Sequence, residues 1–145
     1  MKTDTQQDRL RDIIKIYIAP AMKEAGFKKK GNWFNREGEA NTDFLNIVSS
    51  RWNTNQDVNF TLEAYVMPNG KQPIRDTPIA RKRIGHLRGE QDKWYNLTSK
   101  VDAEVLGQEI TQDISEYVMP FFDSLKKVSR RQVYDILENL ESRGR

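Results

Sequence analysis

The residue types best suited to recognition are concentrated in one stretch, residues 81–97, which reads RKRIGHLRGEQDKWYNL. It combines arginines and lysines with the only histidine, two glycines, two acids and a Trp-Tyr pair. Arginine and tryptophan supply much of the binding energy in protein interfaces. The glycines interrupt any helical pattern in this stretch. Because charged and aromatic side chains are gathered there, we expect it to form a contact surface. Its candidate binding residues are Arg83, His86, Arg88, Asp92 and Trp94.

The same stretch offers little for catalysis. A serine nucleophile needs a base, the only histidine is His86, and no serine lies in a G-x-S-x-G context. Gly85 and Gly89 lack the spacing of either glycine motif that binds phosphates. We assign no catalytic residue, and the sequence leans against an enzyme without excluding one.

Metal binding would depend on carboxylates, because the chain has no cysteine and one histidine. Glu90 and Asp92 are close in sequence, but two acids in a turn are usually solvated. We therefore expect no metal site and no cofactor. A metal-dependent hydrolase that uses Glu90 and Asp92 is the third of three functional hypotheses.

A second basic cluster lies in a predicted turn near the N-terminus. Its candidate binding residues are Lys28, Lys29 and Lys30. If this cluster lies beside residues 81–88, the two form one basic patch that could bind nucleic-acid phosphates, with Trp33 or Trp94 stacking on bases. The net charge of +3 is a mild bias for such a function.

Helical periodicity appears in the sequence on both sides of these clusters. Residues 4–25 place apolar side chains at steps of three and four, which predicts an amphipathic helix with a capping box at Thr5 and a stop at Gly26. A second helix is expected to begin near residues 99–102 and run to Leu125. A short terminal helix is expected at about residues 130–143, where it could form a homodimer contact. Prolines predict a bend in each of the two long helices, at Pro20 and Pro120.

Strand periodicity fills the region between the helices. Residues 33–36, 44–52 and 58–66 alternate and are joined by short links, which predicts an antiparallel meander. In the third of these strands the alternation predicts one buried and one wet face. Residues 82–87 and 94–98 could add a fourth and a fifth strand. We therefore expect an α+β fold, an antiparallel sheet of four to five strands with one N-terminal helix and two C-terminal helices.

Length and composition indicate the number of domains and the class of protein. The chain has 145 residues, of which 37% are hydrophobic and 31% charged, which predicts a single globular domain over residues 1–145. The absence of cysteine fits a reducing compartment, so we expect a cytoplasmic protein. We expect no signal peptide and no membrane span, since no apolar run approaches the roughly 20 residues required.

The order of several motifs resembles an uncharacterised bacterial family, domain of unknown function 4304. The resemblance covers about residues 10–125. Its motifs are PAMKEAGFKKKG at 20–31, FNR at 34–36, IVSSRW at 47–52, FTL at 60–62, RIG at 83–85 and Asp92 with Trp94. The strand that begins at Phe60 continues with Glu63 and Ala64 where Asn and Gly are expected. The resemblance implies a fold and supplies no activity.

These observations favour a non-catalytic protein-binding module. Small bacterial proteins without catalytic residues are often immunity or regulatory factors, which is an argument by analogy. The partner is then another protein, bound by the surface that contains Arg83 and Trp94. The alternative is a nucleic-acid-binding protein that uses the basic clusters.

Overall fold

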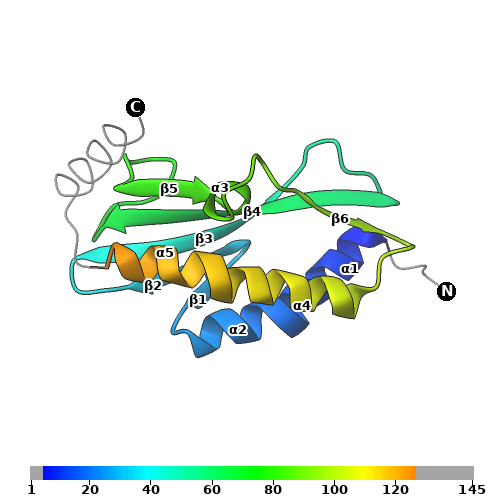
Figure 1. Cartoon of the computed structure of the whole chain (residues 1–145), viewed down its shortest axis with the longest axis horizontal. Coiled ribbons are helices and arrows are strands. Elements are labelled where there is room, and N and C mark those ends of the chain that lie inside the picture. The colour runs from blue at the N-terminus through cyan, green and yellow to red at the C-terminus, as the bar shows by residue number, and fades with distance from the viewer. Residues whose placement is uncertain (1–4, 127–145) are drawn as a thin grey trace.

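The computed structural model describes residues 5–126 of the chain. It has an α+β fold, in which an antiparallel six-stranded sheet carries its long helices on one face (Figure 1). The strands are β1 (Lys28–Lys30), β2 (Trp33–Glu37), β3 (Asn41–Ser49), β4 (Asp57–Pro68), β5 (Ala80–Arg83) and β6 (Tyr95–Thr98). The expected terminal helix at about 130–143, with its homodimer contact, lies outside the described residues.

Two long helical segments cover the sheet, and each contains a π-helical stretch. The first consists of α1 (Gln6–Ile13), η1 (Ile14–Ile18) and α2 (Ala19–Glu24); the second consists of α4 (Ala103–Asp113), η2 (Ile114–Val118) and α5 (Met119–Ser124). Pro20 and Pro120 follow the π-helical stretches by two residues. Proline cannot donate the usual helical hydrogen bond and crowds the preceding turn, so the predicted bends take the form of these wider turns.

The core lies between the helices and one face of the sheet. Alternate residues of β4 from Val58 to Val66 belong to the main core cluster, together with apolar residues of both helical segments. The two segments approach closely where Gly107 meets the ring of Tyr17. A Cβ at Gly107 would lie 2.4 Å from that ring, so only glycine permits this approach.

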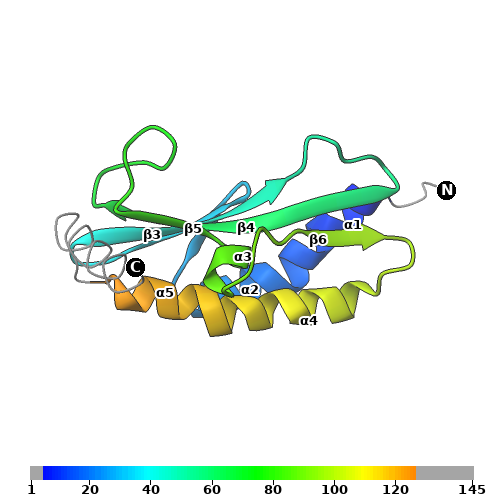
Figure 2. The same ribbon diagram turned by 45° about the horizontal axis from the view of Figure 1, so that its top comes forward.

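The longest strand, β4, pairs with both β5 and β6. The strand order is β1-β2-β3-β4-β5, and β6 also pairs with β4. β5 pairs with residues 63–66 of β4, and β6 pairs with residues 57–60 of the same strand. The chain therefore leaves the sheet after Arg83 and returns at Tyr95. The short helix α3 (Ile84–Leu87) lies on this excursion (Figure 2).

Three local expectations were wrong. Residues 28–30 form β1 rather than a turn, because they pair with β2 through a tight hairpin in which Gly31 has a φ of 61°. The strand expected at 82–87 ends at Arg83, where α3 begins. The second face of β4 is not wet, since Thr61, Glu63 and Tyr65 are all buried.

Candidate functional site

The surface that the sequence singled out is built from residues 80–98, which we call the arginine edge. Close backbone packing holds it together. A Cβ at Gly85 would lie 2.1 Å from the carbonyl oxygen of Gln91 and 2.6 Å from the backbone nitrogen of Lys93. The returning chain is also fixed to β4, because the hydroxyl of Thr61 donates to the Lys93 carbonyl at 2.6 Å. The excursion is thus a packed structure in which residue 85 has no room for a side chain.

A polar pocket of about 450 Å³ opens beside this excursion. We call it the Glu63 pocket, and its lining residues are Glu63, Arg81, Arg83, His86 and Asp92. Only 3% of the surface of Glu63 is exposed. Its carboxylate accepts from Arg81 Nη2 at 3.0 Å and from Arg83 Nε at 3.1 Å. A buried carboxylate needs such partners, so Glu63 of the neighbouring strand β4 anchors the two arginines of β5.

Tyr65 completes the surroundings of this carboxylate. Its hydroxyl donates to Glu63, and Arg81 lies 5.2 Å from the centre of its ring. Burial raises the pKa of Glu63, but the hydrogen bonds from Tyr65 and the two arginines outweigh it and hold that pKa below its ordinary value. Burial and the adjacent carboxylate raise the pKa of Tyr65 to about 12. The buried acid is therefore ionised and the tyrosine neutral at physiological pH.

Asp92 connects the Glu63 pocket to Trp94. One oxygen of its carboxylate accepts from Arg83 Nη1 at 2.8 Å and from the indole nitrogen of Trp94 at 3.1 Å. The guanidinium of Arg83 lies 5.6 Å from the Trp94 ring. Trp94 is 38% exposed, although Asp92 and Arg83 fix the position of its indole.

On its other side, Trp94 lines a groove of about 330 Å³ between β6 and α4. We call this the Trp94 groove. Val101, Val105 and Leu106 give it apolar walls, and the side chain of Val105 is exposed. Lys93 and Glu109, also in the groove, pair with each other at 3.3 Å. Trp94 therefore stands between a pocket lined by charged side chains and a groove lined by both apolar and charged side chains.

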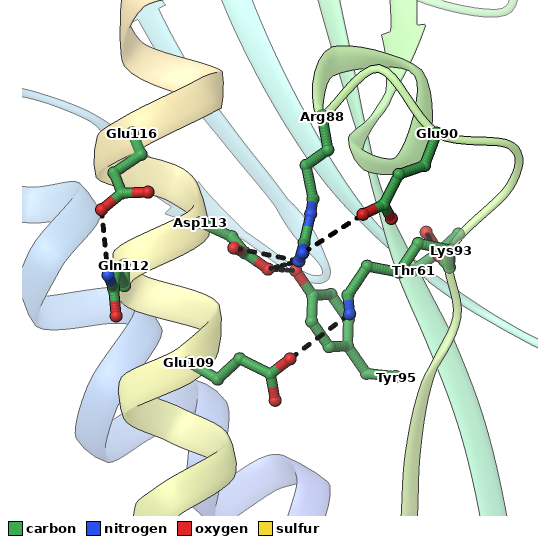
Figure 3. Close-up of polar contacts among 9 residues, drawn as sticks. All are labelled: Thr61, Arg88, Glu90, Lys93, Tyr95, Glu109, Gln112, Asp113 and Glu116. Atoms are coloured by element: carbon green, nitrogen blue, oxygen red, sulfur yellow. Dashed lines mark hydrogen bonds and ion pairs between the residues drawn. The ribbon is translucent and has the colours of Figure 1, made fainter.

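Arg88 does not line the Glu63 pocket, and its side chain points toward Asp113 of α4 (Figure 3). Its Nη1 lies 3.1 Å from Asp113 Oδ2, and its Nη2 lies 3.5 Å from Glu90. The same Asp113 oxygen accepts from the hydroxyl of Tyr95 at 2.6 Å. Burial and this carboxylate raise the pKa of Tyr95. Arg88 thus ties the arginine edge to α4.

The two basic clusters do not converge. Lys28, Lys29 and Lys30 form the whole of β1, which we call the lysine edge. Three strands separate it from β5 in the sheet. Lysine on an edge strand disfavours pairing with another chain, which gives the cluster a structural role without any ligand. The single basic patch of the nucleic-acid hypothesis is therefore absent from the described part of the chain.

The sequence reading brought together Arg83, His86, Asp92 and Trp94, but it missed the carboxylates that organise them. Glu63 is a charged residue in an otherwise uncharged stretch of β4, and an isolated charge in such a strand must find a partner. Asp113 follows Ile110 by three residues and thus lies on the buried stripe of α4. Each of these acids is an exception to the apolar pattern of its element, which indicates a special role. The sequence does not indicate which residue either acid pairs with.

The acids proposed for a hydrolase are occupied by different arginines. Glu90 pairs with Arg88, and Asp92 pairs with Arg83. Within residues 5–126, no group of three or more histidine, cysteine or acidic residues is placed to hold a metal ion. No helix in that range combines the length and hydrophobicity of a membrane span.

Comparison with known proteins identifies a family and no individual relative. No curated protein and no solved structure matches the chain. The model of a family described as a domain of unknown function, DUF4304, matches residues 18–124. That range extends from η1 to the end of α5 and includes both edges of the sheet. The chain therefore belongs to the DUF4304 family.

Proposed function

We propose that this protein is a non-catalytic binding module, and that Trp94 and the Glu63 pocket form its contact surface for another protein. The observation that carries the proposal is the fixed, partly exposed indole of Trp94, held between Asp92 and Arg83. A rigid aromatic side chain beside guanidinium groups is typical of the residues that dominate interface energy. It loses little conformational entropy on binding, because its position is set in advance.

Charge favours a protein partner over nucleic acid. In the Glu63 pocket, the positive charges of Arg81 and Arg83 are matched by the negative charges of Glu63 and Asp92. A phosphate backbone requires cations that are free to replace counterions. The arginines of this surface are already paired, and Trp94 lies beside the apolar side chains of the Trp94 groove. The surface therefore suits a partner segment that places an apolar side chain in that groove.

The proposal extends to the setting of the protein. The absence of cysteine supports a reducing compartment, and we place the module in the cytoplasm on that ground. A bacterial immunity or regulatory factor fits a small binding module, by analogy alone.

The test compares two exposed tryptophans. Tagged wild-type, Trp94→Ala and Trp52→Ala chains are used to capture proteins from lysate of the source cells, with and without nuclease. Trp52 is 77% exposed in the β3–β4 turn, outside the pocket and the groove, so it is the matched control. The captured protein is then purified and titrated against each chain.

We expect a nuclease-resistant protein that binds the wild-type and Trp52→Ala chains alike. Trp94→Ala should weaken its affinity by about 30-fold or more, as for an interface hot spot. His86→Ala adds a second variant that leaves the Glu63 ion pairs intact. Arg83→Ala is a poor probe, because it removes a partner of the buried Glu63. Equal binding by the Trp94→Ala and wild-type chains, or capture that nuclease abolishes, would overturn the proposal.

A further inference from the structure

A second pocket lies at the opposite edge of the sheet, between the N-terminal helical segment and β1. We call it the Lys29 pocket, and its volume is about 300 Å³. Its lining residues are Arg11, Ile14, Lys15, Ala19, Lys29 and Asn32. Three of these side chains are cationic, and no carboxylate of the described residues lines the pocket.

Secondary structure brings the three cations together. Arg11 and Lys15 are four residues apart in the first helical segment, so they lie on one side of it. Lys29 comes from β1, where it is opposite the core residue Phe34 and therefore lies on the helix-covered face of the sheet. Lys28 and Lys30 alternate with it and lie on the other face. Only the middle lysine of the edge strand enters the pocket.

The positive charge of the Lys29 pocket is poorly neutralised. Arg11 pairs with Asp8, which does not line the pocket. Lys15 and Lys29 have no ion pair among the described residues. Like charges at positions i and i+4 of a helix are destabilising, so this arrangement has a cost that an anion would offset. Cations that converge in a concave site also raise the local concentration of anions.

We propose that the Lys29 pocket binds the phosphoryl group of a phosphorylated small molecule. Lysine ammonium groups bind phosphate as point charges, and the Asn32 amide can donate a hydrogen bond. Ile14 and Ala19 supply an apolar wall for the part of the ligand next to the phosphate. The site is independent of the Trp94 surface, since three strands separate β1 from β5.

In the first arm of the test, the full chain is titrated with pyrophosphate at constant ionic strength. Binding is monitored by the chemical shifts of the backbone amides in NMR spectra. We expect saturable shifts at residues 15, 29 and 32. Lys29→Gln and Lys15→Gln should each weaken binding by about tenfold, the loss expected for one charged hydrogen bond. Lys28→Gln, on the other face of the same strand, should change it by less than about twofold.

The second arm identifies the source of the phosphoryl group, with sedimentation of vesicles that contain anionic or only zwitterionic phospholipid. Pyrophosphate binding without vesicle binding assigns a soluble ligand. Binding to anionic vesicles that Lys29→Gln removes and Lys28→Gln preserves assigns a lipid headgroup. Absence of binding in both arms, or equal losses in the Lys29 and Lys28 variants, would overturn the proposal. Partner capture through Trp94 should be unchanged in every lysine variant.

Discussion

Both edges of the sheet are rich in basic residues, but only one of them neutralises their charge. At the arginine edge, every arginine pairs with a carboxylate: Arg81 and Arg83 with Glu63, and Arg88 with Asp113. At the lysine edge, β1 consists of three exposed lysines without ion pairs among the described residues.

The difference follows from the chemistry of the two cations and from their neighbours. A planar guanidinium can bond two carboxylates at once, as Arg83 does with Glu63 and Asp92, whereas an ammonium on a flexible stem remains solvated. The arginine edge is therefore a rigid and nearly neutral surface that suits a protein partner. The lysine edge retains its charge, which is why the anion pocket is proposed there.

The largest loss of stability should come from Gly85 at the arginine edge, with Gly31 at the lysine edge as its comparison. We expect Gly85→Ala to lower the free energy of unfolding by about 3 kcal/mol, because its Cβ would overlap backbone atoms. At the lysine edge, Gly31→Ala should cost about 1 kcal/mol, since its φ is positive but the space around it is open. Urea unfolding measures both. Equal losses would show that the arginine edge can relax.

A somewhat smaller loss of stability is expected when the contact between Arg88 and Asp113 of α4 is removed. Asp113→Ala removes the acceptor of the Tyr95 hydroxyl and the nearer of the two carboxylates that pair with Arg88, which should cost about 2 kcal/mol in chemical unfolding. The matched control is Glu109→Ala on the same helix. Its pair with Lys93 is solvent-exposed, so it should cost less than about 0.5 kcal/mol. Similar losses in the two variants would argue against a special role for the Arg88 link.

The buried carboxylates of Glu63 and Asp43 should affect stability in opposite directions as the pH is lowered. The pKa of Glu63 is lowered in the fold, so its contribution to stability is present above the ordinary value near 4.5 and is lost as the pH falls through the folded pKa. Burial raises the pKa of Asp43 despite its pair with Arg36. The contribution of Asp43 therefore has the opposite sign: it is present below the ordinary value near 3.8 and is lost as the pH rises through the folded pKa.

Urea midpoints measured across the acid range test these signs. Glu63→Gln should flatten the acid loss of the wild type, whereas Asp43→Asn should steepen it. We expect these changes to be smaller than the loss in Asp113→Ala, because Arg81 and Arg83 are partly exposed. A Glu63→Gln profile parallel to that of the wild type would contradict the ion-pair assignment.

The smallest change in stability is expected at the lysine edge. Replacing Lys28 and Lys30 together by Val should alter the free energy of unfolding by less than about 0.5 kcal/mol per site. The same variant should self-associate, because an apolar edge strand can pair with another chain. Light scattering against concentration measures this. A monomeric variant would remove the edge-protection role that we assign to these lysines.

Sequence periodicity predicted most of the fold. The capping box at Thr5, the left-handed Gly26 and the start of the second long helix at Asp102 were all readable as local signals, and each is present. β1 and α3 were not readable, because three lysines have weak strand preference and residues 84–87 form a single turn. Such short elements depend on their neighbours in space.

For the candidate site, local sequence determined which residue types gather between residues 81 and 97, because tryptophan, arginine and acids follow one another there. Only the tertiary structure decided what they do. Strand pairing set Glu63 of β4 beside Arg81 and Arg83 of β5, and packing on α4 brought Arg88 close to Asp113. Ion pairs join residues that are distant in the chain, and their energy depends on burial and distance. Neither quantity exists before the chain has folded.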